Sequence, residues 1–203
     1  MIDMKSGAPA RSYVMTKRAQ SAAATAERIL DAAAGEFEDG TPIAGITLEA
    51  VAARAGVSVQ TVLRRFGDKD GLFAASAERQ AARVAAERDP AVAGDLAGAV
   101  VNLAGHYERD GRLALRLLAE ESSSPFMAAV TGAGRAFHRS WCERVFAPFL
   151  DGLEGAGRRR RLAQIVAVCD VYVWKLLRLD AGLSSQAYRE ALLELLEPLT
   201  RRP

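Results

Sequence analysis

The 203-residue sequence predicts an all-α protein of about nine helices. Apolar side chains recur at helical spacing along most of the chain, and the alternation that is typical of β-strands is scarce after Pro90. Cap residues and glycines mark the ends of the helical segments. Hydrophobic residues make up 50% of the chain and charged residues 26%, which is ordinary for a soluble globular protein of one or two domains.

Residues 1–24 are predicted to form a basic, flexible arm. They carry four basic residues against one acid, and their scattered Gly, Pro, Ser and Ala show no periodicity. Residues 25–38 are predicted to form the first helix, since an apolar stripe recurs there at helical spacing. The members of this stripe are Ile29, Leu30, Ala33 and Phe37.

Residues 47–66 are predicted to form two short helices with almost no room between them. Thr47 and Ser58 are residues that cap helix N-termini, and Gly56 supplies the left-handed backbone that commonly ends a helix. Two helices joined by a short turn that contains glycine form the helix-turn-helix pattern. The turn is too short for antiparallel packing, so the second helix projects outward, where it can enter a DNA major groove.

The outward face of this second helix favours DNA binding over the alternative, a helix pair that serves only as structure. Val62 and Phe66 point inward, and no acid occurs between Ser58 and Phe66. Gln and Arg side chains read base edges bidentately. Lys69 lies in the first turn of the next helix, where a bound phosphate would satisfy both the lysine and the free N–H groups. The candidate DNA-contacting residues are Ser58, Val59, Gln60, Thr61, Leu63, Arg64, Arg65 and Lys69.

Residues 55–73 read Ala-Gly-Val-Ser-Val-Gln-Thr-Val-Leu-Arg-Arg-Phe-Gly-Asp-Lys-Asp-Gly-Leu-Phe. This stretch resembles the DNA-binding signature of the TetR/AcrR family of bacterial transcriptional regulators. The resemblance implies a helix-turn-helix domain that also contacts phosphate through Thr47. The sequence departs from the family pattern at Leu63, where a phosphate-binding tyrosine is usual, and at Arg65, where His or Tyr is usual. Either Arg64 and Arg65 replace the lost contact, or Leu63 touches a thymine methyl group.

We expect three parts: the arm at 1–24, the DNA-binding domain at 25–80, and a ligand-binding and dimerisation domain at 81–203. The arm either stays disordered or follows phosphates and the minor groove. A helix at 69–88 links the two domains. The expected C-terminal helices are 92–109, 111–121, 125–150, 158–180 and 184–200, with breaks at Asp110-Gly111, 122–125 and 151–157. The four arginines of 158–161 are interpreted as a solvated helix start.

The last two expected helices predict a homodimer. Residues 158–180 carry apolar side chains on nearly every face, and such a helix is buried all round. The resemblance implies the same arrangement, in which two helices from each chain form a four-helix interface. The expected interface residues are Ile165, Cys169, Tyr172, Leu176, Leu192, Leu195, Leu196 and Leu199.

The middle helices are expected to enclose a ligand cavity, although the same residues equally suit a plain core. Aromatic and methionine side chains with a few polar groups are typical of small-molecule pockets. The candidate lining residues are His106, Tyr107, Leu117, Phe126, Met127, Phe137, Trp141 and Trp174.

No catalytic or metal-binding arrangement is predicted. The sequence shows no Ser-His-Asp or Cys-His pattern, no Gly-rich phosphate loop and no zinc spacing. Cys142 and Cys169 are interpreted as small buried hydrophobic residues, and His106 and His138 as lacking a ligand at metal-binding spacing. There is no apolar run of membrane-spanning length and no signal-peptide core, so we expect a bacterial cytoplasmic protein without a cofactor.

These expectations combine into a sequence-specific, homodimeric repressor that a small-molecule inducer releases from a double-stranded operator with an inverted repeat. Its partners would be the operator, a second copy of the chain and an unidentified effector, and it would have no membrane partner. The alternative is an activator or an architectural DNA-binding protein that needs no effector.

Overall fold

The structure, a computed structural model, describes residues 9–201, with side chains described at residue 17 and from residue 20 on. The described residues form helices joined by turns and contain no strand, so the all-α prediction is confirmed. The chain divides into two compact units, with the boundary between Arg79 and Gln80. Along the described residues, no helix combines the length and the hydrophobicity needed to cross a membrane.

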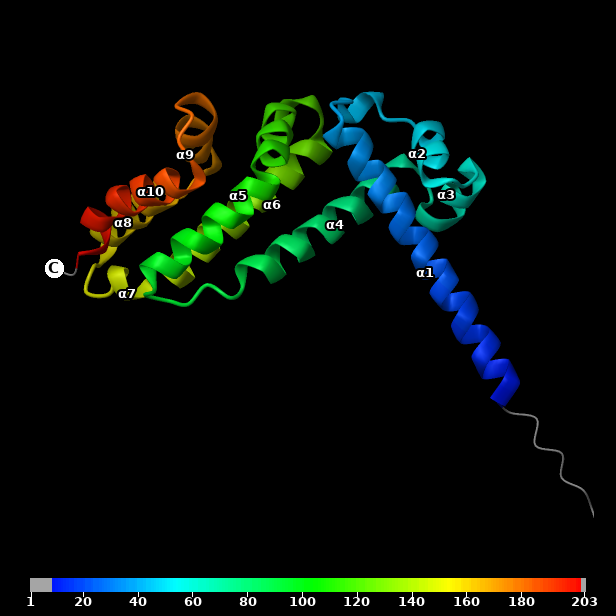
Figure 1. Ribbon diagram of the computed structural model, residues 1–203, viewed down its shortest axis with the longest axis horizontal. Helices are drawn as coiled ribbons and strands as arrows, with labels where there is room; N and C mark the ends of the chain where they lie inside the picture. Colours follow the sequence, from blue (N-terminus) through cyan, green and yellow to red (C-terminus); the bar gives the residue numbers. More distant parts are fainter. Residues whose placement is uncertain (1–8, 202–203) are drawn as a thin grey trace, which may run out of the picture. The chain divides into compact units, whose positions relative to one another are not determined.

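The first helix, α1, is far longer than expected and runs from Pro9 to Glu38 (Figure 1). The sequence predicts a flexible arm at residues 1–24, but residues 9–24 are helical; residues 1–8 lie outside the described part. The extension has a simple cause: the segment is rich in alanine and other good helix formers, and adding turns to an existing helix is easy. It needs no apolar stripe, which is why periodicity did not reveal it.

The helix-turn-helix pair consists of α2 (Leu48–Ala55) and α3 (Val59–Phe66). Thr47 caps α2, with its Oγ1 accepting a hydrogen bond of 3.1 Å from the N–H of Ala50. Gly56 ends α2 at φ 65°, in the left-handed region that favours glycine, and Ser58 caps α3. A 3₁₀ turn, Ile43–Gly45, precedes α2. The caps and the glycine therefore act as the sequence predicts.

The fourth helix, α4 (Lys69–Arg88), begins in the first unit and ends in the second. Leu72 and Phe73, near its start, are buried in the first unit. One continuous helix therefore runs through the boundary between the two units.

In the second unit, α5 (Leu96–Ala119) is one helix where two were expected. The predicted break at Asp110-Gly111 is wrong. Gly111 lies inside the helix and packs directly against the Trp174 ring. A Cβ atom at this position would lie 2.5 Å from that ring, so only glycine permits this close packing. Asp110 is buried and bonded to neighbouring side chains, which removes its tendency to start a turn.

The remaining helices differ from the expected ranges mainly at their ends. They are α6 (Pro125–Val145), α7 (Ala147–Leu150), α8 (Gly155–Val168), α9 (Val171–Trp174), the π-helical turn Lys175–Asp180 and α10 (Ser185–Thr200), with a 3₁₀ turn at Glu121–Ser123. The expected single helix at 158–180 is interrupted because Asp170 caps α9, its Oδ1 accepting from the N–H of Tyr172 at 3.0 Å.

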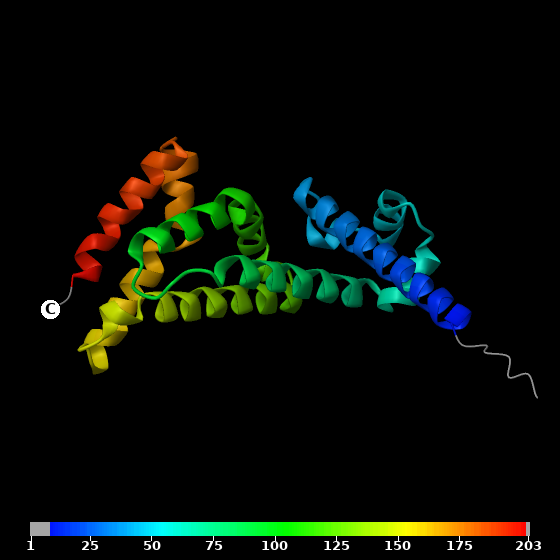
Figure 2. The same ribbon diagram turned by 60° about the horizontal axis from the view of Figure 1, so that its bottom comes forward.

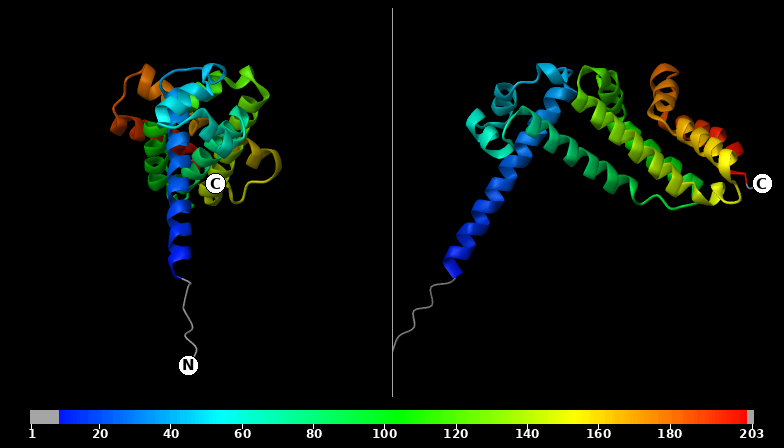
Figure 3. Two further views of the ribbon diagram at one scale, coloured as in Figure 1. Left: turned by 90° about the vertical axis from the view of Figure 1, so that its right-hand side faces the viewer. Right: turned by 180° about the vertical axis from the view of Figure 1, so that it is seen from behind.

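The core of the second unit lies between α5, α6, α8, α9 and α10. Figures 2 and 3 show α5 beside α6 and α8 beside α10, and side chains from all five helices meet in a single buried cluster. Leu103, Cys142, Ile165, Leu192 and Leu196 are at most 1% exposed there. The inward faces of these helices form the core, and their outward faces are left at the surface of the protomer.

Candidate nucleic-acid interface

The recognition helix, α3, rests on a small core that α1 and α2 share with it. Ile29 of α1, Val51 of α2 and Val62 of α3 are all fully buried, and Ile46 closes the same core. Burying an aliphatic side chain of this size contributes about 1.5–3 kcal/mol. The core therefore holds one side of α3 in place and leaves the other side facing outward.

The outward side of α3 carries the residues that the sequence singled out. Gln60, Arg64 and Arg65 are exposed, as is Ser58 before them. Val59, Thr61 and Leu63 are half-buried along the edges of this face. Side chains that can form two parallel hydrogen bonds with one partner therefore point away from the protein on a helix without acids.

The start of α3 is held by its cap. The Oγ of Ser58 accepts from the N–H of Thr61 at 3.3 Å and lies 3.0 Å from the Oγ1 of Thr61. The helix N-terminus carries a partial positive charge that favours an anion nearby. The two hydroxyl groups are already oriented by each other, so a phosphate there would meet them in place.

Two arginines of the first unit neutralise part of its acidic charge. Arg54 contacts Asp39 at 2.5 Å and Glu36 at 3.4 Å. Arg79 contacts Asp31 at 2.7 Å and Glu27 at 2.9 Å. Residues 25–80 carry nine acids against six bases. Among the described residues no acid pairs with the two arginines of α3, so the positive charge of that helix stays available.

Lys69 has a structural bond that the sequence did not indicate. Its Nζ donates to the carbonyl oxygen of Ala44 at 3.0 Å and lies 5.5 Å from the centre of the Phe73 ring. The lysine thus connects the start of α4 to the turn before α2. An ammonium group has three donors, so this bond leaves two for a phosphate.

Gly71 is required by the backbone geometry of the domain, and the sequence analysis does not single it out. A Cβ atom at this position would come within 2.0 Å of the carbonyl oxygen of Phe66. The N–H of Gly71 also donates to the Oδ1 of Asp68 at 2.8 Å, which caps α4. The backbone at the junction between α3 and α4 therefore fits glycine only. The available signal was a glycine inside a helical pattern, which usually has a packing reason.

The expected ligand-cavity residues pack as a core. His106, Tyr107, Met127, Trp141 and Trp174 are buried, and Leu117, Phe126 and Phe137 are half-buried. The polar ends of three aromatic residues have partners. Tyr107 donates to the carbonyl oxygen of Cys169 at 3.0 Å, Trp141 to that of Arg88 at 3.0 Å, and Trp174 to the Oε1 of Glu108 at 3.3 Å.

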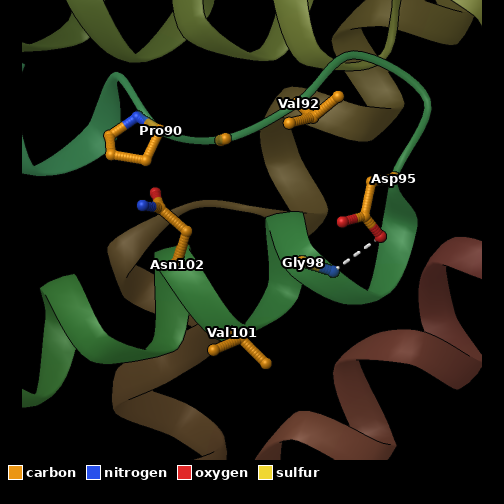
Figure 4. A pocket seen from close by; sticks show the side chains of 7 residues that line it. Pro90, Val92, Asp95, Gly98, Val101 and Asn102 are labelled. Carbon is orange, nitrogen blue, oxygen red and sulfur yellow. Dashed lines mark hydrogen bonds between the residues drawn. The ribbon is translucent and has the colours of Figure 1, made fainter.

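Two surface pockets of the second unit are lined by other residues. One, of about 210 Å³, lies between residues 90–95 and the first turns of α5, with Val92, Val101 and Asn102 in its wall (Figure 4). The other, of about 290 Å³, lies beside Arg160, Arg161 and Leu199. None of the eight expected residues lines either pocket.

The expected dimer-interface residues separate into two groups. Ile165, Cys169, Leu192 and Leu196 lie in the core of the protomer itself, so they leave no surface for a partner. The exposed fractions of Tyr172, Leu176 and Leu195 are 53%, 57% and 45%, and Leu199 is half-buried. The first four belong to the core because α8 and α10 turn one face inward against α5 and α6, and only the second group is available to a partner.

One cluster of metal-ligand types does occur, contrary to the sequence reading. His106 and Asp110 are one helical turn apart, and with Glu87 they bring their ligand atoms within 4.8 Å of one another. Arginines already occupy the carboxylates. Arg83 pairs with both Asp110 and Glu87, and Arg109 pairs with Glu87 at 2.8 Å. Burial alone would raise the pKa of Asp110, but His106, whose Nδ1 lies 3.4 Å from the carboxylate, and the hydrogen bond from Arg83 outweigh it and lower the pKa to about 2.

The first unit therefore has the architecture of a helix-turn-helix domain, with an exposed basic recognition helix. The family model for bacterial regulatory proteins of the tetR family matches residues 29–76, which contain the buried part of α1, all of α2 and α3, and the start of α4. The domain belongs to this family, and the protein is a DNA-binding transcriptional regulator.

The likeness of fold extends beyond that domain. A solved structure of a transcriptional regulator from Rhodococcus sp. Rha1 is similar to this chain with a TM-score of 0.63. The two sequences are 22% identical, and the match covers 88% of this chain and 95% of that one. Comparison with curated proteins gives no match.

Proposed function

We propose that the protein is a homodimeric repressor that binds an inverted-repeat operator through α3 and is released from it by a small-molecule effector. The observation that carries this proposal is the exposed, acid-free face of α3, opposite the fully buried Val62. A helix that is fixed on one side and presents Arg and Gln on the other has the chemistry of major-groove reading.

In this proposal the DNA contacts have two kinds of role. Gln60, Arg64 and Arg65 lie outermost and read base edges, with the half-buried Val59, Thr61 and Leu63 beside them. Leu63 replaces a phosphate contact with an apolar surface that suits a thymine methyl group. Thr47, Ser58 and Lys69 lie at helix starts and bind phosphates, which fixes the position of α3 without reading sequence.

The proposed dimer uses the exposed apolar side chains of the C-terminal helices. Tyr172, Leu176 and Leu195 are among the most exposed large hydrophobic residues described, and Leu199 is half-buried on the same final helix as Leu195. Covering such a patch with its own copy is a common solution for soluble proteins. A two-fold dimer would present two recognition helices roughly 34–36 Å apart, one turn of DNA.

An activator or architectural protein without an effector remains the second candidate. It is favoured by the dense packing of the residues that were expected to line a cavity. Such a protein would share the first unit but would respond to no small molecule.

Two measurements test the proposal. Sedimentation of the protein with a bound operator duplex is expected to give two chains per inverted repeat, and one chain per duplex would overturn the dimer. In vitro transcription from a promoter that contains the operator is expected to fall when the protein is added. A rise in transcript would favour the activator.

A further inference from the structure

Arg88, in the second unit, is a buried arginine that has no acidic partner among the residues that the structure describes. It is the last residue of α4, and only 2% of it is exposed. Its guanidinium lies 4.0 Å from the centre of the Trp141 ring and 5.7 Å from that of Phe137. The backbone around it is fixed as well, since its carbonyl oxygen accepts from the Nε1 of Trp141 at 3.0 Å.

The unpaired atoms of this guanidinium form one edge. Nε and Nη2 are both buried without a hydrogen-bond partner among the described residues. These two nitrogens point their N–H bonds in parallel, and this is an edge that receives a carboxylate through two hydrogen bonds. Buried donors of this kind are rare in folded proteins, and a missing ligand is one of their ordinary explanations.

No acidic group among the described residues takes the place of that carboxylate. Burial lowers the pKa of Arg88, and the groups that act most strongly on its charge are Tyr107, Cys142, Cys169 and Arg144. None of them is a carboxylate, and none bonds to the free edge. A buried charge that is left unpaired costs several kcal/mol, so the site favours an anion from outside the chain.

The surface pocket of about 210 Å³ lies close to the end of α4, since Pro90 and Ala91, which follow Arg88 in the chain, line it. Asn102 lines this pocket (Figure 4). Its Nδ2 donates at 2.9 Å to the carbonyl oxygen of Glu87, the residue before Arg88. The Oδ1 of Asn102 is a second buried polar atom without a partner in the described structure. Val92 and Val101 at the rim are 64% and 57% exposed, so the mouth of the pocket is apolar.

We propose that Arg88 binds the carboxylate of a small organic anion that enters through this pocket, past Asn102, and that this anion is the effector. The aromatic side chains around the guanidinium suit an acid with an apolar or aromatic body. The assignment as effector rests on the proposed function. Because Arg88 lies in the last turn of α4, the helix that continues into the DNA-binding unit, an anion bound there acts on that helix directly.

The test uses the full-length protein and defined probes: benzoate, phenylacetate and octanoate, each compared with its neutral amide. Calorimetry and thermal melting are expected to show that at least one acid binds and raises the melting temperature, while its amide does not. Arg88→Met is expected to abolish this binding. Arg88→Lys keeps the charge but loses the two-bond edge, so it is expected to bind at least about tenfold more weakly. Arg139→Met, the same exchange at an exposed position of α6, is the matched control and is expected to bind as wild type.

The melting temperature without ligand separates a binding role from a structural one. If the role of Arg88 is to bind an anion, Arg88→Met removes an unpaired buried charge and raises the melting temperature of the free protein. A lower melting temperature together with no response to any of the three acids would overturn the proposal. Operator release is measured separately. If an acid binds at Arg88 but does not release the protein from DNA, the binding site is supported and the role of the acid as effector is overturned. Both the binding result and the release result are independent of whether the protein represses transcription.

Discussion

The Nζ of Lys69 donates a hydrogen bond of 3.0 Å to the carbonyl oxygen of Ala44, across the helix-turn-helix pair. The lysine thereby joins the start of α4 to the turn before α2, while its other two donors remain for DNA. A single side chain thus connects the internal geometry of the domain to its candidate phosphate contact.

Lys69→Ala is expected to weaken binding to all duplexes about equally, because a phosphate contact carries no sequence information. The slope of the logarithm of the binding constant against the logarithm of the salt concentration should fall in magnitude by about one. Fluorescence anisotropy on an operator and on a scrambled duplex, at several salt concentrations, measures both effects. A variant that loses affinity for the operator alone would show that Lys69 reads bases.

Arg64→Ala is expected to reduce the preference for the operator by about 1–3 kcal/mol while nonspecific binding changes little, since Arg64 is exposed on the outward face of α3. The same anisotropy assay gives the ratio of the two affinities. Arg159→Ala is the control and is expected to behave as wild type, since Arg159 is an exposed member of the arginine run 158–161, which we interpret as a solvated helix start. If Arg64→Ala and Lys69→Ala lost specificity to the same extent, the division of roles would be wrong.

Gly71→Ala is expected to destabilise the first unit by about 1–3 kcal/mol, because the added methyl group meets the carbonyl oxygen of Phe66. Gly134→Ala makes the same change in an exposed part of α6, where nothing lies within 4 Å, and is expected to stabilise by about 0.5–1 kcal/mol. Urea unfolding of both variants measures the difference. Equal effects of the two substitutions would contradict the close approach at the junction between α3 and α4.

Asp110→Asn is expected to cost about 2 kcal/mol at pH 6, and this cost is expected to disappear as the pH falls toward 2. The pKa of Asp110 is lowered to about 2 in the folded protein. The carboxylate therefore contributes stability above the unfolded pKa of about 4, and this contribution is lost as the pH falls through the folded pKa. Urea midpoints of both proteins between pH 2.5 and pH 6 test the sign. A gap that stays constant over this range would exclude the charge of Asp110 as its source.

Leu176→Glu and Leu195→Glu are each expected to give a monomer, because each places a charge on the exposed apolar surface that we assign to the dimer. Val92→Glu is the control, since Val92 is equally apolar and more exposed but lies outside the proposed interface. Sedimentation velocity gives the mass of each variant. A dimeric Leu195→Glu would remove α10 from the interface.

The helix-turn-helix pair could be predicted in detail because its signals are local. The caps at Thr47 and Ser58 and the glycine at position 56 each act through bonds within a few residues. The outward face of α3 followed from the same reasoning, since a short helix with one buried stripe leaves few choices for its other side chains.

What could not be predicted depends on contacts between distant residues. Gly111 is read as a helix break from its neighbours, but the Trp174 ring, far along the chain, explains its place inside α5. Ile165 is assigned to the dimer because residues 158–180 carry apolar side chains on nearly every face, and Leu192 because the final helix adds further leucines to them. Only the packing of α5 and α6 against them shows that they belong to the protomer core. The unpaired edge of Arg88 has no signal in the sequence.

The proposed dimeric reading of DNA is tested most directly by selection of random duplex DNA on the purified protein, at moderate salt, with sequencing of the bound pool. An inverted repeat whose half-sites lie about one helical turn apart is expected to be enriched, and the Arg64→Ala variant is expected to lose that enrichment. A pool that stays random, or that is enriched in a single unrepeated site, would contradict a dimer that reads DNA through two α3 helices.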